Sequence, residues 1–382
     1  MTIGTIAVLG AGHGGFGAAA DLSLRGYEVR LYARSEANLA PIRRTGGIHV
    51  DGVQKGFARL AAVTTDMAEA IDGADLINVV LPAVGYPHYA RTLAPLLRPE
   101  HIIFVDPGHT FGGLRFANEL RKAGYQGELQ TCETASITHG SRKKGAVETV
   151  ASIGADTDDE AAVFIAKYIE NLGFSAFPGK HADRLFELLQ PVYPEIRLRS
   201  SVIETAFANV NAVFHPPGMI LNAGWVEFTG GDFLFYNEGI TEAVGRVTQA
   251  IDDERLAVAA ALGVPATPFL DLFYEMGMTT AEAHASGSIH RACVESAPNR
   301  MAKAPATLRH RYVDEDLGFG LVPMSQVGAL VGVPTPAIDA LVSMASFATG
   351  VDYRREGMTL ESIGIDGMSV DQLKHFVWNG SL

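Results

Sequence analysis

The pattern of hydrophobic and polar positions changes character near residue 180. Before that point, short apolar runs alternate with amphipathic stretches of helical period. Short buried strands that alternate with helices are typical of an open parallel sheet covered by helices. The runs that we expect to form strands are "TIAVLG", "YEVRLYA", "ADLINVVLPAVG", "IIFVDPGHTFGG", "GELQTCETAS" and "ETVASIGA".

After residue 180 the period changes, and long amphipathic segments predict helices. They cover roughly residues 183–189, 198–214, 241–262 and 325–331. Two helix exits, "ALGVPATPFLDL" and "LVGVPTPAIDAL", place a glycine after the last periodic residue and a proline beyond it. We therefore predict an α/β domain over residues 1–182, an all-helical domain over residues 183–382, and an active site in the cleft between them.

The stretch "FANVNAVFHPPGMILN" contains a histidine, His215, directly before two prolines. A proline biases the residue before it away from the α region, so this sequence predicts a bend at His215. Such an imidazole could be a group aimed into a cleft, or simply a hydrogen-bonded histidine between two helices. The local sequence leaves both interpretations open.

The first predicted strand leads into a glycine-rich turn. Gly10, Gly12 and Gly15 form G-x-G-x-x-G, with His13 and Gly14 between them, and a helix follows. The first glycine permits the tight turn, the second lets the backbone approach a pyrophosphate, and the third lets helix and strand pack closely. The N–H groups at the helix start can bind phosphate. Strand, turn, helix and second strand together predict a Rossmann-type, doubly wound sheet that binds a dinucleotide.

The end of the second strand bears on the choice of cofactor. An NAD site typically has Asp or Glu there for the ribose 2′-hydroxyl, whereas this chain has Arg34. A guanidinium suits a 2′-phosphate, so we favour NADP(H) over NAD(H), with a solvated arginine as the alternative. Pro82 and Thr134 follow later strands, at the end of the sheet where ligands of such folds bind.

Composition excludes several other classes of protein. The net charge of −13 and the lack of a Lys/Arg block argue against a nucleic acid or an anionic membrane as partner. Cys132 and Cys293 are too few for a disulfide framework and fit a reducing, cytoplasmic setting. We expect no metal site, because no zinc-type Cys/His spacing occurs. We also expect no signal peptide and no membrane span, which would need about 18 apolar residues.

The helical part contains groups suited to proton transfer. A hydride-transfer enzyme exchanges a proton with the carbonyl or imine that it reduces, and histidine suits this because its pKa is near ~6.5. A carboxylate that accepts a hydrogen bond from one ring nitrogen makes histidine a better acid–base group, because it stabilises the imidazolium. His215 and the acidic residues of "RHRYVDEDLGFGLVP" are therefore candidates, although spacing alone does not pair them.

Three stretches resemble the octopine/nopaline (opine) dehydrogenase family. They are "GAGHGG", "NAVFHPPGMILNAG" and "RYVDEDLGFGLVP…GVPTP", in the same order and over nearly the whole chain. The resemblance implies a Rossmann domain followed by an all-helical domain. It also implies an NAD(P)H-dependent reductive condensation of an amino acid amine with a 2-oxo acid through an imine, and the reverse oxidation.

The resemblance also implies roles for individual residues. His215 matches the family's catalytic histidine, Asp316 its carboxylate partner, and Arg311 an arginine that binds a substrate carboxylate. Asn222 and Tyr236 are candidates for the substrate pocket together with Thr134, although helix capping and packing are alternative roles. His13 replaces the family's usual asparagine, and "LGFG" after Asp316 also departs from the pattern.

The expected partners are two small molecules, an amino acid and a 2-oxo acid, and a homodimer remains open. Two rival functions share this domain arrangement. A 2-hydroxy-acid or ketopantoate-type reductase would reduce a ketone without an amine. A dinucleotide sensor would bind cofactor and reduce nothing.

Overall fold

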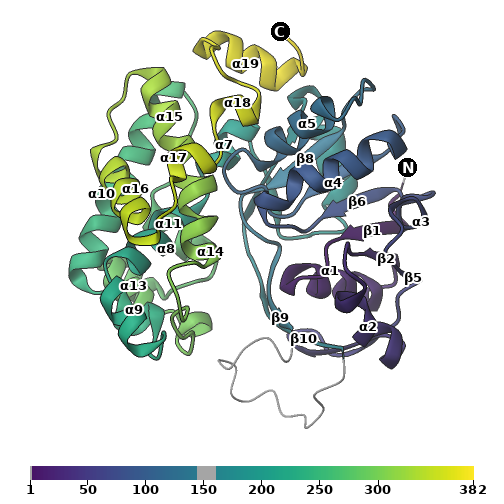
Figure 1. Ribbon diagram of the computed structural model, residues 1–382, viewed down its shortest axis with the longest axis horizontal. Coiled ribbons are helices and arrows are strands. Elements are labelled where there is room, and N and C mark those ends of the chain that lie inside the picture. Colours follow the sequence, from purple (N-terminus) through teal and green to yellow (C-terminus); the bar gives the residue numbers. More distant parts are fainter. Residues whose placement is uncertain (1, 144–160) are drawn as a thin grey trace. The chain divides into compact units, whose positions relative to one another are not determined.

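The chain forms two compact units in the computed structural model, which describes residues 2–143 and 161–382 (Figure 1). Unit 1 consists of the described residues up to Gly108, of 112–198 and of Trp378–Gly380. Unit 2 consists of His109–Phe111, Arg199–Val377 and the last two residues. Each unit is described by itself below.

Unit 1 is built on an eight-stranded sheet in the order β12-β11-β8-β7-β6-β1-β2-β5. The strands from β5 to β8 run parallel, and β11 is antiparallel to β8. The strands of this sheet are β1 (Thr5–Leu9), β2 (Glu28–Tyr32), β5 (Ala62–Thr64), β6 (Leu76–Val79), β7 (Ile102–Val105), β8 (Thr131–Thr134), β11 (Leu172–Phe177) and β12 (Ile196–Leu198). The chain moves outward from β1 in both directions, so the order reverses between β1 and β6, where ligands of such sheets bind.

Helices cover both faces of this sheet. Figure 1 shows α4 and α5 on one side of the strands and α1 and α2 on the other. The helices of unit 1 are α1 (His13–Leu24), α2 (Glu36–Thr45), α3 (Met67–Ile71), α4 (Tyr86–Leu93), α5 (Gly112–Lys122) and α6 (Ala182–Leu189), with 3₁₀ turns at Ala83–Gly85, Ala94–Leu96 and Gly179–His181. α6 and β12, which follow the predicted domain boundary at residue 182, belong to unit 1. The predicted Rossmann-type sheet is confirmed.

A second, four-stranded sheet packs on α1, and no sequence pattern predicted it. Its order is β4-β3-β10-β9. The strands are β3 (Ile48–Gly52), β4 (Gly56–Ala58), β9 (His139–Lys143) and β10 (Ala162–Tyr168). α1 contacts strands of both sheets and is buried on nearly all sides, which explains why its sequence is apolar all round. The strand predicted in "ETVASIGA" lies outside the described residues.

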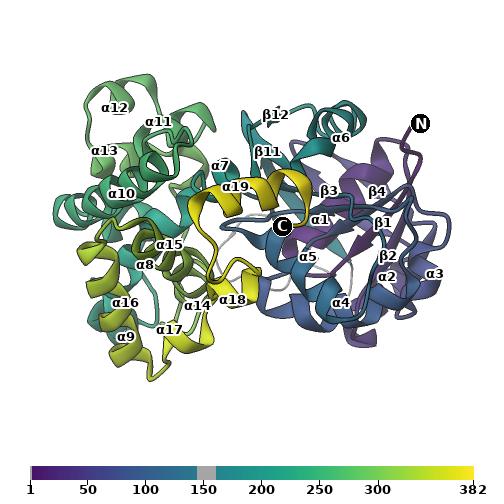
Figure 2. The same cartoon turned by 90° about the horizontal axis from the view of Figure 1, so that it is seen from above.

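Unit 2 is helical throughout, apart from a two-residue bridge between Leu234 and Lys303. The long helix α10 (Glu242–Leu262) packs against α8, α13, α15 and α16 (Figure 2). The remaining α-helices that begin in unit 2 are α7 (Val202–Ala206), α8 (Val210–Ile220), α9 (Ala223–Thr229), α11 (Phe269–Glu275), α12 (Ala281–Ala285), α13 (Ile289–Val294), α14 (Arg311–Asp314), α15 (Val322–Val331), α16 (Pro336–Thr349), α17 (Tyr353–Glu356), α18 (Leu360–Ile363) and α19 (Val370–Asn379). The segments η4 (Phe235–Gly239) and η6 (Leu317–Leu321) are π-helical, and Ala297–Asn299 is a 3₁₀ turn. None of the helices among the described residues is both long enough and apolar enough to cross a membrane.

The predicted bend at His215 is wrong, because α8 continues through Pro216 and Pro217. The two prolines lack the N–H groups that would bond the preceding turn, which normally costs about 3 kcal/mol or more. Tertiary packing offsets this cost, since every residue of α8 from Ala212 to Ile220 is buried. The predicted helix over residues 198–214 is accordingly divided into α7 and the first part of α8.

The start of α8 is fixed by two sets of hydrogen bonds. Asn209 caps the helix by accepting from the backbone N–H of Asn211. Arg255 of α10 is fully buried, pairs with Asp252 at 2.6 Å and donates to the Phe207 carbonyl. These contacts hold the end of α7 and the start of α8 against the longest helix of the unit.

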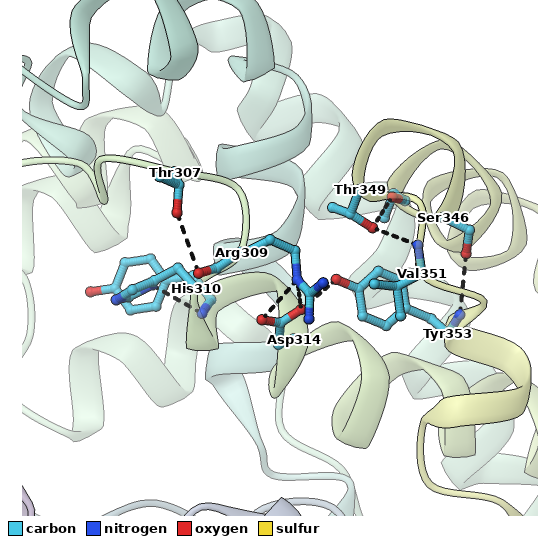
Figure 3. Close-up of polar contacts among 10 residues, drawn as sticks. Thr307, Arg309, His310, Asp314, Ser346, Thr349, Val351 and Tyr353 are labelled. Atoms are coloured by element: carbon cyan, nitrogen blue, oxygen red, sulfur yellow. Dashed lines mark hydrogen bonds and ion pairs between the residues drawn. The ribbon is translucent and has the colours of Figure 1, made fainter.

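A separate polar network anchors α14, the helix that leads toward Asp316. Figure 3 shows Arg309 and Tyr353 both reaching the carboxylate of Asp314. The Tyr353 hydroxyl donates to it at 2.6 Å, and the Arg309 Nε donates at 3.0 Å. Tyr353 itself is buried, so its hydroxyl contributes to the stability of this part of unit 2.

Candidate functional site

The glycine turn of unit 1 has the close backbone contacts that its sequence predicts. Gly10 has a φ of 121°, and a Cβ there would lie 2.3 Å from the Val80 carbonyl oxygen. A Cβ at Gly15 would lie 1.8 Å from the Gly10 carbonyl oxygen. A Cβ at Gly12, by contrast, would meet nothing within 4 Å. Gly10 and Gly15 therefore close the turn, whereas Gly12 leaves open space at the start of α1.

This open space fits the pyrophosphate of a dinucleotide. The first turn of α1 contains no acidic residue, and Gly12, at its N-cap, has no side chain to cap it. Backbone N–H groups at a helix start attract phosphate through hydrogen bonds and the helix dipole. Within the described part of the chain, no cluster of three or more His, Cys, Asp or Glu side chains could hold a metal ion.

The other predicted cofactor residues surround this turn at the same edge of the sheet. Gly10 donates its N–H to the Tyr32 carbonyl, and Arg34 follows two residues later with an exposed side chain. Pro82 follows the segment that packs under Gly10 and is also exposed. His13 is turned toward the second sheet, because its Nδ1 accepts from the backbone N–H of Lys143 at 3.0 Å.

Unit 2 brings His215 and Asp316 together. The Nδ1 atom of His215 lies 2.7 Å from Oδ2 of Asp316, and the two side chains are only 4% and 7% exposed. They are 101 residues apart in the sequence. A second histidine–carboxylate pair in the same unit, His284 with Asp271 at 2.6 Å, is 31% and 45% exposed. Burial, not distance, distinguishes the first pair from the second.

Two glycines allow the segments that carry this site to approach α8. A Cβ at Gly320 of η6 would lie 2.7 Å from Cβ of Ala212, and a Cβ at Gly218 would lie 2.6 Å from the Phe235 ring of η4. The two π-helical segments therefore pack closely against α8, and Asp316 lies at the start of η6. π-helical turns are frequent at functional sites, where they re-aim side chains.

Aromatic rings enclose the imidazole of His215. The Tyr312 ring is stacked on it at 3.7 Å with an angle of 11° between the planes, and Phe214 and Phe235 lie at 4.2 and 5.9 Å. The Tyr236 hydroxyl lies 3.2 Å from Nε2. Asp316 on one side and Tyr236 on the other thus fix the plane and direction of the imidazole.

Burial also changes the acidity of these groups. It raises the pKa of Asp316 to about 6, and the nearby His109 and Arg311 oppose that rise. His109 was not among the predicted residues. Burial lowers its pKa to about 4, although Asp316 partly opposes this, and its Nδ1 has no hydrogen-bond partner among the described residues. Its φ of 52° is unusual for a residue other than glycine, and "DPGHTFGG" was the only sequence signal that could have drawn attention to it.

The remaining predicted substrate residues have different surroundings. Arg311 begins α14 with an exposed side chain, and its guanidinium lies 5.7 Å from the centre of the Tyr312 ring. Asn222 donates to the carbonyls of Gly218 and Gly239, and so ties α8 to the end of η4. Thr134 is fully buried at the end of β8 in unit 1. Their contact with a substrate stays a prediction.

Comparison with known proteins identifies the family. Residues 198–349 match the model for the NAD/NADP octopine/nopaline dehydrogenase alpha-helical domain, and residues 5–111 match the NAD-dependent glycerol-3-phosphate dehydrogenase N-terminus. The opine dehydrogenase of Arthrobacter sp. (strain 1C) is 32% identical over 376 residues, which is 98% of either chain. The chain belongs to the opine dehydrogenase family. The predicted family is confirmed, and the chain is an NAD(P)-dependent oxidoreductase that condenses an amino acid amine with a 2-oxo acid reductively.

Other relatives and solved structures resemble the chain at lower identity, and the solved structures show its fold. The vitopine synthase of Allorhizobium ampelinum is 25% identical over 95% of this chain and 96% of its own length. An octopine dehydrogenase structure with NADH and agmatine shares the fold with a TM-score of 0.74 and 19% identity, over 99% of this chain and 98% of that one. A ketopantoate reductase from Ralstonia eutropha has a TM-score of 0.57 and 17% identity, over 91% and 98%. The opine dehydrogenase architecture thus resembles this chain more closely than the fold of the predicted rival.

Proposed function

We propose that His215 and Asp316 exchange the protons of the condensation. The observation that carries this proposal is the buried 2.7 Å contact between Nδ1 and Oδ2. An ionised carboxylate can only accept a hydrogen bond, so Nδ1 carries the hydrogen and Nε2 is the basic nitrogen. Asp316 then stabilises the imidazolium that forms when Nε2 takes up a proton.

These roles fit the chemical demands of the reaction. An ammonium group must lose a proton before it attacks the 2-oxo acid, and the hydroxyl of the adduct must gain one before it leaves as water. A single group that accepts and returns a proton serves both steps. The bound nicotinamide supplies the hydride.

We further propose that Arg311 holds a carboxylate of the substrates. Arg311 is an exposed residue, and its guanidinium lies beside Tyr312, which is itself stacked on His215. A planar guanidinium binds a carboxylate through two parallel hydrogen bonds and so fixes its orientation. A substrate bound in this way would have its reacting atoms held near the imidazole. Proton transfer would then take place within one bound complex in a fixed geometry.

For the cofactor, we propose a preference for NADPH over NADH, with Arg34 as the contact to the 2′-phosphate. Its exposed side chain follows β2, whose last residue accepts a hydrogen bond from Gly10. The position is the one where NAD-binding sheets usually place an acidic residue. We propose unit 1 as the dinucleotide-binding part and unit 2 as the part that carries the proton chemistry.

The proposal is tested by steady-state oxidation of NADPH with a panel of amino acids and 2-oxo acids. His215→Ala should lower kcat by at least about 10²-fold, the usual contribution of a general acid–base group, while NADPH affinity stays unchanged. His284→Ala is the matched control, because it removes a histidine from the exposed pair of the same unit, and it should leave kcat unchanged.

Two results would contradict the proposal. Normal turnover by His215→Ala would remove the acid–base role of this histidine. Oxidation of NADPH with a 2-oxo acid alone, at a rate independent of the amine, would show a ketone reductase instead.

A further inference from the structure

The buried histidine–carboxylate pair continues into a third residue, Tyr236. Its hydroxyl lies 3.2 Å from Nε2 of His215, so the three side chains form a continuous chain from Asp316 through the imidazole to the phenol. Tyr236 lies on η4, 21 residues after His215, and is 6% exposed. The direction of the hydrogen bonds along this series of three side chains decides whether Tyr236 donates a proton to His215 or accepts one from it.

The Tyr236 phenol donates the hydrogen bond that it shares with Nε2 of His215. Because Nδ1 donates to Asp316, Nε2 of the neutral imidazole can only accept, and the O–H of Tyr236 therefore points at it. Burial raises the pKa of Tyr236 well above its ordinary value, electrostatic repulsion by Tyr312 and a hydrogen bond with it add to the rise, and Arg311 opposes it. The phenol is thus protonated at neutral pH, and its hydroxyl lies close enough to Arg311 and Tyr312 to be affected by both.

The surrounding packing keeps this geometry fixed. Asn222 donates to the Gly239 carbonyl at 2.9 Å and so fixes the end of η4. Tyr312 covers one face of the imidazole and prevents it from rotating out of line with the phenol. In the described structure, the Nε2 atom with which His215 would accept a proton lies within hydrogen-bond distance of the Tyr236 hydroxyl.

We propose that Tyr236 is a catalytic residue that relays protons between His215 and the reacting atoms of the substrate. This inference rests on the proposed function of His215. As the substrate ammonium gives a proton to the phenol oxygen, the phenol's own proton passes to Nε2, and the imidazolium is balanced by Asp316. After the amine has attacked the carbonyl carbon, the proton returns along the same path to the oxygen.

A second cycle completes the loss of water. The relay takes another proton from the nitrogen of the adduct and delivers it to the hydroxyl, which leaves as water while the C=N bond forms. Two protons have then moved from nitrogen to the departing oxygen, the product is a protonated imine, and all three side chains are back in their initial state.

The test is the Tyr236→Phe variant, which keeps the ring and removes only the hydroxyl. We expect kcat to fall by about 10²-fold, the solvent deuterium isotope effect on kcat to change, and NADPH affinity to stay unchanged. Tyr353→Phe is the matched control, because it removes a buried hydroxyl that donates to Asp314 in the same unit. It should lower the melting temperature and leave kcat and its pH profile within about twofold of the parent.

If Tyr236→Phe is unstable, a second measurement tests the relay with the hydroxyl still in place. Replacing Tyr236 by a fluorinated tyrosine lowers the pKa of the phenol with little change in its size, and the basic limb of the pH profile of kcat should then move to lower pH. The relay would be contradicted if the pH profile of kcat did not move, or if kcat of Tyr236→Phe were equal to or above that of the parent. Tyr236 would then only hydrogen-bond Nε2 of His215 until the substrate displaces it.

These outcomes are separate from a failure of the proposed function. If the parent needs both amine and 2-oxo acid and His215→Ala is inactive, the proposed function stands whatever Tyr236→Phe does. A parent that oxidises NADPH without amine, or an active His215→Ala variant, overturns the proposed function and the relay together.

Discussion

The Asp316→Asn variant removes the charge beside His215 and keeps a group of nearly the same shape. The amide oxygen can still accept from Nδ1, so the neutral imidazole retains its orientation. The imidazolium formed during turnover loses its counter-charge. Two unit charges about 4 Å apart attract each other by ~4 kcal/mol at an effective dielectric constant of about 20, so we expect kcat to fall by roughly 10²- to 10³-fold.

The same variant should not lose stability at high pH. Burial raises the pKa of Asp316 from 3.8 in the unfolded chain to about 6. A carboxyl group with a raised pKa stabilises the folded state below its unfolded pKa, and this stabilisation is lost as pH rises through the folded value. A shift of roughly two units corresponds to about 3 kcal/mol, which the ionised carboxylate costs the folded state above pH 6 and which asparagine avoids. Loss of a charge-assisted hydrogen bond offsets about 1 to 2 kcal/mol of that gain.

Two assays check this pair of expectations. Turnover is followed by NADPH oxidation between pH 5 and 9, where the parent should lose activity as pH falls through about 6 because Asp316 takes up a proton. Thermal unfolding at pH 5 and pH 8 should show a variant at least as stable as the parent at pH 8, with a smaller advantage at pH 5. A variant with kcat within tenfold of the parent would show that the charge of Asp316 is not needed for turnover, and one that is clearly less stable at pH 8 would show that the buried carboxylate does not destabilise the folded protein.

Further expectations concern unit 1. Arg34→Ala should raise the KM for NADPH by about tenfold or more and leave the KM for NADH within about twofold, since a charged hydrogen bond to phosphate contributes about 1.5 to 3 kcal/mol. Arg44→Ala, the matched control, removes the same charge from the exposed end of α2. The contact between Arg34 and the 2′-phosphate would be contradicted if both variants raised the KM for NADPH equally, or if Arg34→Ala raised the KM for NADPH and for NADH equally. Gly15→Ala should destabilise unit 1 by about 3 kcal/mol or more, because its Cβ would lie 1.8 Å from a backbone oxygen. Gly12→Ala should instead leave the melting temperature within a few degrees and weaken dinucleotide binding by about tenfold or more, because its Cβ would fill only the space left for the pyrophosphate. Normal cofactor affinity in Gly12→Ala would show that the ligand does not occupy this space.

The parts of the fold that the sequence predicted are those with local signals. The turn from β1 to α1 is specified by glycines at fixed spacing, and the exits of α10 and α15 by Gly263 and Gly332, both in the left-handed conformation. The second sheet has no such signal. It pairs β3 with β10 across more than a hundred residues, and β4 is only three residues long. Pairing between distant short strands depends on tertiary packing, which periodicity does not record.

The candidate site was predictable in its residue types and less so in its geometry. The resemblance supplied His215, Asp316 and Arg311, and the structure adds that the first two are in contact and buried. The prolines after His215 suggested a helix end, because their cost is local and visible in the sequence. The packing that offsets this cost is not visible there. His109 and the orientation of Tyr236 were equally hidden, since both depend on backbone conformations that have no sequence pattern.

Burial is the property that makes a histidine–carboxylate pair useful for proton transfer in this protein. His284 and Asp271 are as close as His215 and Asp316, but water screens their charges and competes for their hydrogen bonds. Around His215, Gly218 and Gly320 let η4 and η6 approach α8 so closely that aromatic rings replace water on the faces of the imidazole. The carboxylate is destabilised by this burial and becomes a stronger partner for an imidazolium, because the attraction between the two charges grows as the surroundings become less polar. The energy that the folded chain spends on an ionised Asp316 is therefore recovered only when His215 is protonated, which is the state that the reaction must reach.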